Sequence, residues 1–190
     1  RPGLYEYPFG VSMNEILQDC GAENVQAVQI GGPSGQLIPP TEFCRKLAFE
    51  DLATGGSFMV FNESRNLLDV IQNFSAFFRH ESCGFCTPCR VGTSLLEKQL
   101  NKIMVGHATT KDLEYIKTIG QLMKESSHCG LGSTAANPLL DSMCRFPLVY
   151  KSRLRSTGFE PSFDVDASLE EARQVTGRTD AGAHLPGGGV

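Results

Sequence analysis

The first third of the chain has short apolar segments separated by turn-forming residues. Three segments have the length and residue types of β-strands: residues 4–7, 25–30 and 58–61. Between the first two, Ser12 and Glu15 have the spacing of a capping box, which predicts a short helix that stops near residue 20. Glycine-rich residues 31–35 predict a turn after the second strand. Strands on either side of a short helix predict a compact β-grasp-like unit over residues 1–64.

From residue 65 onward, the apolar positions recur every three or four residues, as they do on one face of a helix. The first helix presents Leu67, Val70, Ile71, Phe74, Phe77 and Phe78 on that face. A second helix is predicted over residues 91–105, a third follows the connection at residues 107–110, and a fourth begins at Gly130. The predicted inward positions of the third helix are Leu113, Ile116, Ile119, Leu122 and Met123. Four helices with short links predict a four-helix bundle over residues 65–150, and together with the first unit they make the fold class α+β.

After residue 150 the pattern is less regular, and residues 151–190 are predicted to form an irregular C-terminal tail. Ser168 has the spacing of a capping box that opens a short helix, which Gly177 should end. Residues 185–189 have too little apolar surface to offset the entropy of ordering and are predicted to be mobile. The basic residues 151–155 have two interpretations: a contact with a partner, or the solvated helix end that such a run more commonly represents.

Composition and charge limit the classes of protein. The chain has 190 residues, of which 41% are hydrophobic, and its net charge is −4, so a globular fold without a broad nucleic-acid surface is expected. No apolar run approaches the ~18 residues that span a bilayer, so no membrane insertion is expected. An odd number of cysteines and no signal peptide favour a reducing compartment, the cytoplasm. Residue 1 is Arg rather than Met, which suggests processing or the end of a longer protein.

Candidate chemistry is concentrated in the cysteines. Three of the seven form the run Cys83-Gly84-Phe85-Cys86-Thr87-Pro88-Cys89, and Cys129 stands next to a second glycine-rich segment. Iron–sulfur clusters require four thiolates, often three from one tight segment and one from elsewhere. Gly84 permits close approach of the backbone, and Pro88 fixes the loop where a helix begins. The spacing therefore favours an iron–sulfur site.

The charge balance favours the same site. A [4Fe-4S] core with four thiolates has a net charge of about −2, and about −3 when it is reduced. Helices that begin near Cys89 and Cys129 would point N–H groups toward this anion. The basic residues Arg79, His80 and Arg90 are close by in the sequence.

Other interpretations of the cysteines remain open. Structural zinc also takes four cysteines, although usually as two separated C-x2-C pairs, and a redox C-x-x-C would leave the third cysteine unexplained. His128 is either a donor to the cysteine sulfurs, a substitute ligand or an outward-facing side chain. The remaining cysteines are expected to be inert, buried or half-buried thiols: Cys20, Cys44 and Cys144.

Residues 80–92 and 127–132 together resemble the iron–sulfur segment of the family of NADH-binding flavoprotein subunits. This family includes subunits of respiratory complex I and the diaphorase subunits of NAD-linked formate dehydrogenases and NAD-reducing hydrogenases. Phe85, residues 135–138 and the long tail after Tyr150 look most like the hydrogenase diaphorase subunit. Residues 1–64 look like the family's soluble-ligand-binding β-grasp (SLBB) domain. The resemblance covers roughly residues 1–155.

The resemblance implies that Cys83, Cys86, Cys89 and Cys129 ligate a [4Fe-4S] cluster in the helical domain. The cluster would relay single electrons between FMN and the iron–sulfur subunit of a multisubunit hydrogenase or dehydrogenase. FMN and NAD would bind only in an upstream region of the same subunit, because this chain has no G-x-G-x-x-G motif. No catalysis is expected from this chain alone, although it would be part of an NAD-linked oxidoreductase. The alternatives are the same role in formate dehydrogenase or complex I, and a non-redox zinc-binding scaffold.

Overall fold

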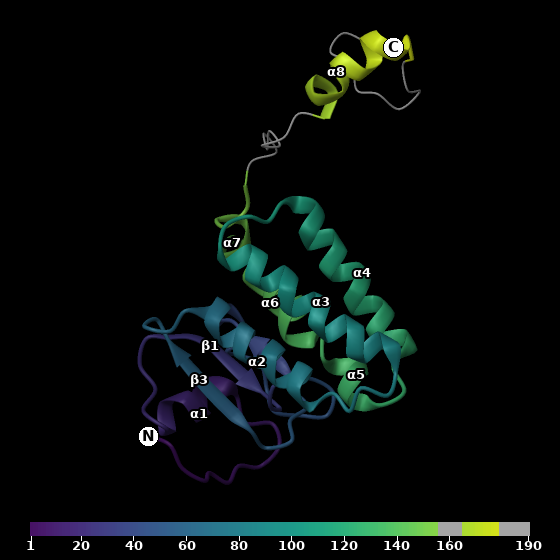
Figure 1. The fold of residues 1–190 in the computed structure, drawn as a ribbon. Helices are drawn as coiled ribbons and strands as arrows, with labels where there is room; N and C mark the ends of the chain where they lie inside the picture. Colours follow the sequence, from purple (N-terminus) through teal and green to yellow (C-terminus); the bar gives the residue numbers. More distant parts are fainter. Residues whose placement is uncertain (156–164, 179–190) are drawn as a thin grey trace. The chain divides into compact units, whose positions relative to one another are not determined.

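The computed structural model describes residues 1–155 and 165–178, and its contacts divide the chain into two units, Arg1–Arg155 and Ser156–Val190 (Figure 1). The first unit combines a small antiparallel sheet with helices, which agrees with the predicted α+β class. Its sheet and first helix come first in the chain, and the longer helices follow. None of the described helices is both long and apolar enough to cross a lipid bilayer.

The sheet has β1 (Val25–Ile30) at its centre, between β2 (Gln36–Ile38) and β3 (Phe58–Asn62), and both pairings are antiparallel. The predicted strands at 25–30 and 58–61 are therefore confirmed. β2 was not predicted, because three residues are too few to show a period. The turn before it is confirmed, and it requires glycine: a Cβ added to Gly35 would lie 1.7 Å from the Ile30 carbonyl oxygen.

Each face of the sheet packs against a different core, which is why β1 is buried on both sides. Val28, Ile30 and Ile38 face α1 (Met13–Asp19), whereas Ala27 and Leu37 belong to the core of the helical part. The capping box that starts α1 is confirmed: the backbone N–H of Ser12 donates to the Glu15 carboxylate at 2.8 Å. The sheet is thus a middle layer between α1 and the longer helices.

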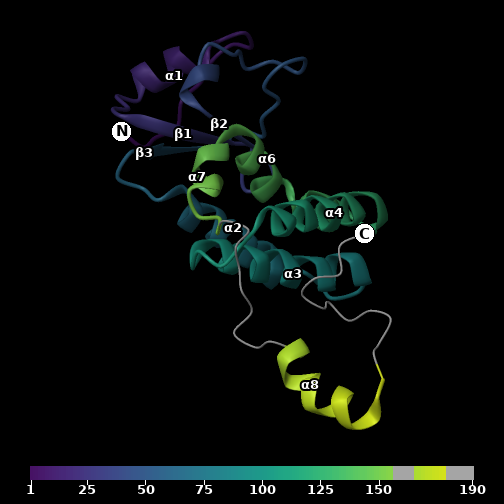
Figure 2. The same ribbon diagram turned by 90° about the horizontal axis from the view of Figure 1, so that it is seen from above.

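Three long helices follow the sheet: α2 (Leu67–Glu81), α3 (Thr87–Met104) and α4 (Thr110–Ser126). α3 packs against both α2 and α4, and Figure 2 shows α3 and α4 lying side by side. α3 begins four residues earlier than predicted, since Pro88 needs no N–H partner in the first turn of a helix. Phe77 and Leu122, which were predicted to face inward, lie at the edges of their apolar stripes and are 45% and 56% exposed.

The predicted fourth helix is not continuous, so the simple four-helix bundle is wrong in this detail. The chain instead forms α5 (Gly130–Thr134), α6 (Asn137–Arg145) and α7 (Pro147–Lys151). Pro138 and Pro147 lie in the first turns of α6 and α7. A proline in a helix interior removes a backbone hydrogen bond and clashes with the preceding turn, so each proline starts a new helix.

The predicted strand at residues 4–7 is also wrong: these residues are irregular, and no described residue pairs with them. An alternating pattern forms a strand only where a neighbour satisfies its backbone groups.

In the second unit, α8 (Val165–Thr176) begins before Ser168, which therefore lies inside the helix rather than capping it. Gly177 ends α8 at φ +63°, as predicted. The predicted mobile segment 185–189 lies outside the described residues.

A polar network joins the sheet to the helical part. Asp141 on α6 accepts the backbone N–H of Leu37 in β2 at 2.6 Å, and it also pairs with Arg145 at 2.8 Å. Arg145 reaches across to Glu42, which pairs in turn with Arg45. Burial alone would raise the pKa of Glu42, but the two arginines outweigh it and hold that pKa below its usual value.

Candidate metal centre

The candidate ligands lie in two similar turns between helices. The C-cap of α2 is Ser82, and the loop that follows leads to Cys86, the N-cap of α3. The C-cap of α4 is Ser127, and it is followed by Cys129, the N-cap of α5. Because α5 packs against both α3 and α4, the two turns are brought to one region of the helical part.

Cys86 connects the two turns. The pKa of its thiol is lowered, first because the backbone N–H of His128 donates to its sulfur and second because the N–H of Cys89 does so. Burial acts in the opposite direction and raises this pKa, whereas the hydroxyl of Ser127 lowers it by a smaller amount. The Cys86 sulfur therefore lies within reach of the backbone directly before Cys129. N–H groups at the start of a helix favour an anionic sulfur here.

Cys89 lies in the first turn of α3 and is only 5% exposed. Its sulfur is 3.2 Å from the hydroxyl oxygen of Ser82. A Cβ added to Gly132 of α5 would lie 2.9 Å from the Cys89 Cβ and 2.7 Å from the Ser127 Cβ. Gly132 is therefore needed for α5 to approach the start of α3 this closely.

Cys83 and Cys129 are exposed. The loop that contains Cys83 is braced from α3, because Arg90 donates to the carbonyl oxygen of Gly84 at 2.7 Å. Gly84 has φ +76°, a conformation that favours glycine. The Phe85 ring, 76% exposed, contacts the His128 ring edge-to-face with centroids 5.4 Å apart, which is a second link between the two turns.

The four sulfurs do not converge on one point. Over residues 1–155 and 165–178, no three His, Cys, Asp or Glu side chains lie close enough to share a single metal ion. In a [4Fe-4S] cluster each thiolate binds a different iron, so the ligands line a wider space than those of one zinc ion. The assignment of all four cysteines as ligands remains a prediction.

The residues present nevertheless fit an anionic iron–sulfur group. All four candidate ligands are soft sulfur donors, which iron–sulfur clusters select. The backbone N–H groups of His128 and Cys89 already point at one of these sulfurs. The buried hydroxyl of Ser127 makes no hydrogen bond of standard geometry within residues 1–155 and 165–178, and it lies near the Cys86 sulfur, so a donor is available for a sulfur-rich group.

The basic residues near the turns have other roles than the sequence suggested. Arg79 pairs with Glu97 of α3, and Arg90 braces the cysteine loop. His80 is exposed, with its ring 4.0 Å from the Glu81 carboxylate. In the basic stretch 151–155, the side chains of two arginines donate to carbonyl oxygens at the end of α3. These are Arg153 to Met104 and Arg155 to Gly106.

The cysteines outside the two turns partly differ from expectation. All seven cysteines are free thiols. Cys20 is half-buried, as expected, and its thiol donates to the Leu17 carbonyl oxygen at 3.3 Å. Cys44 and Cys144 are exposed, which corrects the expectation that they are buried or half-buried. Cys44 lies shortly after the 3-10 helix Pro40–Glu42, and Cys144 lies on the solvent-exposed face of α6.

Sequence reasoning missed the two serines, Ser82 and Ser127. Each precedes a cysteine-bearing turn, and that position was their only signal in the sequence. Their contacts with sulfur depend on how the helices pack, so spacing alone could not reveal them.

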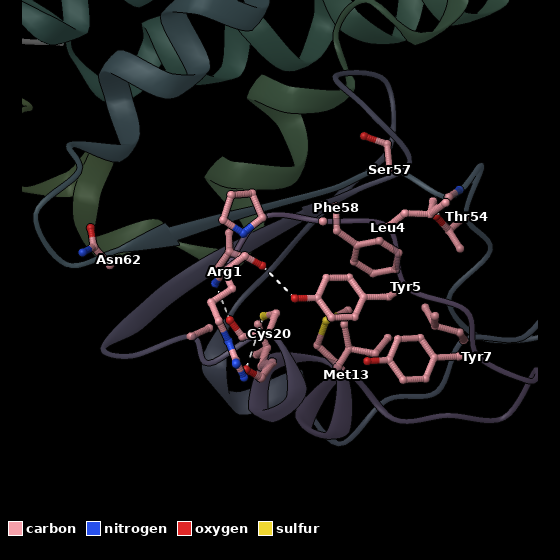
Figure 3. Close-up of a pocket in the computed structure, with 18 of the residues that line it drawn as sticks. Arg1, Leu4, Tyr5, Tyr7, Met13, Cys20, Thr54, Ser57, Phe58 and Asn62 are labelled. Carbon is pink, nitrogen blue, oxygen red and sulfur yellow. Dashed lines mark hydrogen bonds between the residues drawn. The ribbon is translucent and has the colours of Figure 1, made fainter.

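A cavity of about 1090 Å³ lies elsewhere, between the N-terminal segment, α1 and β3 (Figure 3). Tyr5, Met13 and Phe58 line it, and Tyr7 donates to the Asp19 carboxylate at 2.9 Å. Burial, followed by this contact with Asp19, raises the pKa of Tyr7 to about 12. None of the four candidate ligands lines this cavity, so it is separate from the candidate metal centre.

Comparison with known proteins finds a family model that matches the helical part of the chain, which contains the candidate ligands. Residues 69–153 match the family model described as the NADH-ubiquinone oxidoreductase-F iron-sulfur binding region. The alpha subunit of the NAD-reducing hydrogenase HoxS of Cupriavidus necator is 42% identical over 172 residues, which are 89% of this chain and 29% of that protein. An NADH-quinone oxidoreductase subunit of Mycobacterium bovis is 30% identical over 173 residues, 85% of this chain and 39% of that protein.

Among solved structures, a crystal structure of NAD+-reducing NiFe-hydrogenase in the H2-reduced state is similar, with a TM-score of 0.78 and 43% sequence identity. The match covers 98% of this chain and 33% of that chain. This chain thus spans about a third of the length of the relatives that it matches.

Proposed function

We propose that Cys83, Cys86, Cys89 and Cys129 hold a [4Fe-4S] cluster, because residues 69–153 match the NADH-ubiquinone oxidoreductase-F iron-sulfur binding region model. One observation supports the ligand assignment: the two cysteine-bearing turns lie side by side, with the Phe85 and His128 rings 5.4 Å apart edge-to-face. The backbone N–H of His128, which lowers the pKa of the Cys86 thiol, agrees with this placement of the turn that contains Cys129.

The protein groups around the site suit an anion that gains charge on reduction. A [4Fe-4S] cluster accepts one electron and becomes more negative by one unit of charge. Cys86 and Cys129 are the N-caps of α3 and α5, so backbone N–H groups at these helix starts face the site. Buried Cys89 keeps part of the site away from water, which strengthens each of these interactions.

The proposed role is the electron-transfer part of a hydrogenase diaphorase subunit. The chain would pass single electrons between FMN, held with NAD by an upstream region, and the iron–sulfur chain of a partner subunit. The 42% identity to the alpha subunit of an NAD-reducing hydrogenase favours this assembly over a complex I type. A flavin exchanges two electrons with NADH and one with iron–sulfur centres, so such a relay is needed between them.

The domain organisation follows the same proposal. Residues 1–64 would form an SLBB-type β-grasp domain, residues 65–150 the helical iron–sulfur domain, and residues 151–190 a C-terminal tail. The apolar core around α1 lies entirely within residues 1–64 and supports a separate first domain, whereas the other face of the sheet shares its core with the helical part. No nucleic acid and no membrane insertion enter this proposal.

Anaerobic reconstitution of the chain with iron and sulfide tests the ligand set. We expect about four irons and four sulfides per chain, with the broad visible absorbance of an iron–sulfur protein. Cys129→Ser should lose the intact cluster, whereas Cys144→Ser, which changes an exposed cysteine outside the two turns, should keep it. Binding of one zinc ion in place of iron and sulfide, or equal iron contents in the two variants, would overturn the proposal.

A further inference from the structure

Two serines occupy equivalent places in the two cysteine-bearing turns. Ser82 is the C-cap of α2 and Ser127 the C-cap of α4, and both have extended backbone conformations. Each therefore turns the chain out of a long helix immediately before a segment that contains candidate ligands. This places one hydroxyl in each turn beside a candidate cysteine.

The contacts of the Ser82 hydroxyl show which group donates the hydrogen bond between Ser82 and Cys89. The backbone N–H of Gly84 donates to the Ser82 hydroxyl oxygen at 3.4 Å, and the same oxygen is 3.2 Å from the Cys89 sulfur. In the free thiol either atom of that pair can donate. A cysteine that ligates iron has no proton, so Ser82 must then be the donor.

Among the described residues, the buried Ser127 hydroxyl makes no hydrogen bond of standard geometry, although it lies near enough to the Cys86 sulfur to help lower the pKa of that thiol. Gly132 leaves it room, because a Cβ at that position would lie 2.6 Å from the hydroxyl oxygen. A buried hydroxyl without a partner costs free energy unless it finds an acceptor. The nearby Cys86 sulfur, as a thiolate, is an acceptor of this kind.

We propose that Ser82 and Ser127 are positioning residues that donate hydrogen bonds to the Cys89 and Cys86 thiolates and thereby raise the reduction potential of the cluster. This inference rests on the proposed function. Each O–H dipole stabilises negative charge on a sulfur, and the reduced cluster has more of that charge than the oxidised one. Hydrogen bonds to the sulfurs are one of the main determinants of cluster potential.

The test uses the full chain with a reconstituted cluster and needs no enzymatic activity. Ser82→Ala and Ser127→Ala should keep full iron and sulfide content but lower the midpoint potential measured by spectroelectrochemistry, and the double variant should lower it further. Ser82→Thr, which keeps the hydroxyl, should restore the wild-type value. Ser94→Ala is the matched control, because Ser94 is an exposed serine of α3 whose hydroxyl donates to the Arg90 carbonyl oxygen and not to a candidate sulfur among the described residues.

Vibrational spectra provide a second measurement. The Fe–S(Cys) stretching frequencies of the wild-type chain should shift between H2O and D2O, because exchangeable hydroxyl and backbone N–H protons bond to the sulfurs, and the shift should be smaller in Ser82→Ala and Ser127→Ala, each of which loses one hydroxyl donor but keeps the N–H donors. Full cluster occupancy in both alanine variants with unchanged potentials would overturn the proposal. Loss of the cluster in these variants, together with no isotope shift in the wild type, would overturn it as well. A wild-type chain that binds no cluster would instead contradict the proposed function itself.

Discussion

Gly132 provides the most direct test of how α5 is seated on α3, through the substitution Gly132→Ala. The added methyl group would lie 2.6 Å and 2.7 Å from Ser127 Oγ and Cβ, and 2.9 Å from Cys89 Cβ. Two of these atoms are Cβ atoms, which are fixed to the backbone and cannot rotate away. The clash can therefore be relieved only if α5 moves away from both the start of α3 and Ser127 at the end of α4.

The expected magnitude comes from two opposing terms. Overpacking a well-filled core costs about 1–3 kcal/mol, and the fixed contacts at Gly132 put this site at the upper end. Replacing a helical glycine with alanine returns up to about 1 kcal/mol through helix propensity. The net loss in free energy of unfolding should therefore be about 2 kcal/mol. The same movement of α5 should separate Cys129 from the other turn, so the iron content after reconstitution should also fall.

Gly130→Ala is the matched control in the same helix. A Cβ at Gly130 has no atom within 4 Å, and its φ is not in the left-handed region. Urea denaturation of the unloaded chain should show unchanged or slightly increased stability for Gly130→Ala and a clear decrease for Gly132→Ala. Equal stability and equal iron content of the two variants would refute the close approach of α5 to α3.

Two further predictions concern charged groups away from the cysteines. Arg145→Met should lower the free energy of unfolding by about 1–3 kcal/mol in urea denaturation, because it leaves the Glu42 carboxylate with one cation fewer; an unchanged value would show that the network contributes nothing. The pKa of Asp112 is lowered, since its bonds to Lys102 and Thr109 outweigh the opposing effect of burial. Its stabilising contribution is therefore present above the usual carboxyl pKa of about 4 and is lost as pH falls below it. Asp112→Asn should give a shallower loss of stability on acidification, and an identical pH dependence would contradict this.

Patterns that depend on neighbours in the sequence were predicted well. The capping box at Ser12, the strand at 25–30 and the apolar face of α2 all follow from local spacing and hydrogen bonding, and the structure contains each of them. The failures depend on distant partners or on backbone chemistry. Residues 4–7 have a strand pattern but no strand beside them, and Pro138 interrupts the predicted fourth helix.

The candidate site shows the same division. Three candidate ligands could be selected from their spacing, and Cys129 from its glycine-rich neighbours and the family resemblance, because cluster ligands come from a small set of residue types. The contact between Cys86 and the backbone of His128 could not be selected in this way. It depends on α3, α4 and α5 packing so that two turns meet, which is a property of the whole core. The hydroxyls of Ser82 and Ser127 became candidates only once that packing was known.

The position of the basic stretch after α7 links the end of the helical part to the site. α3 has Cys86 at its N-terminus, where the helix dipole favours an anion, and carbonyl groups at its C-terminus, where the dipole favours a cation. Arg153 and Arg155 donate to the carbonyl oxygens of Met104 and Gly106 at that end. Sulfur anions and arginine cations would therefore occupy opposite ends of one helix, each in its favourable place. Because helix-end effects fall off within about one turn, the basic stretch stabilises the C-terminal end of α3, the helix that begins at Cys86 and contains Cys89, rather than the sulfurs directly.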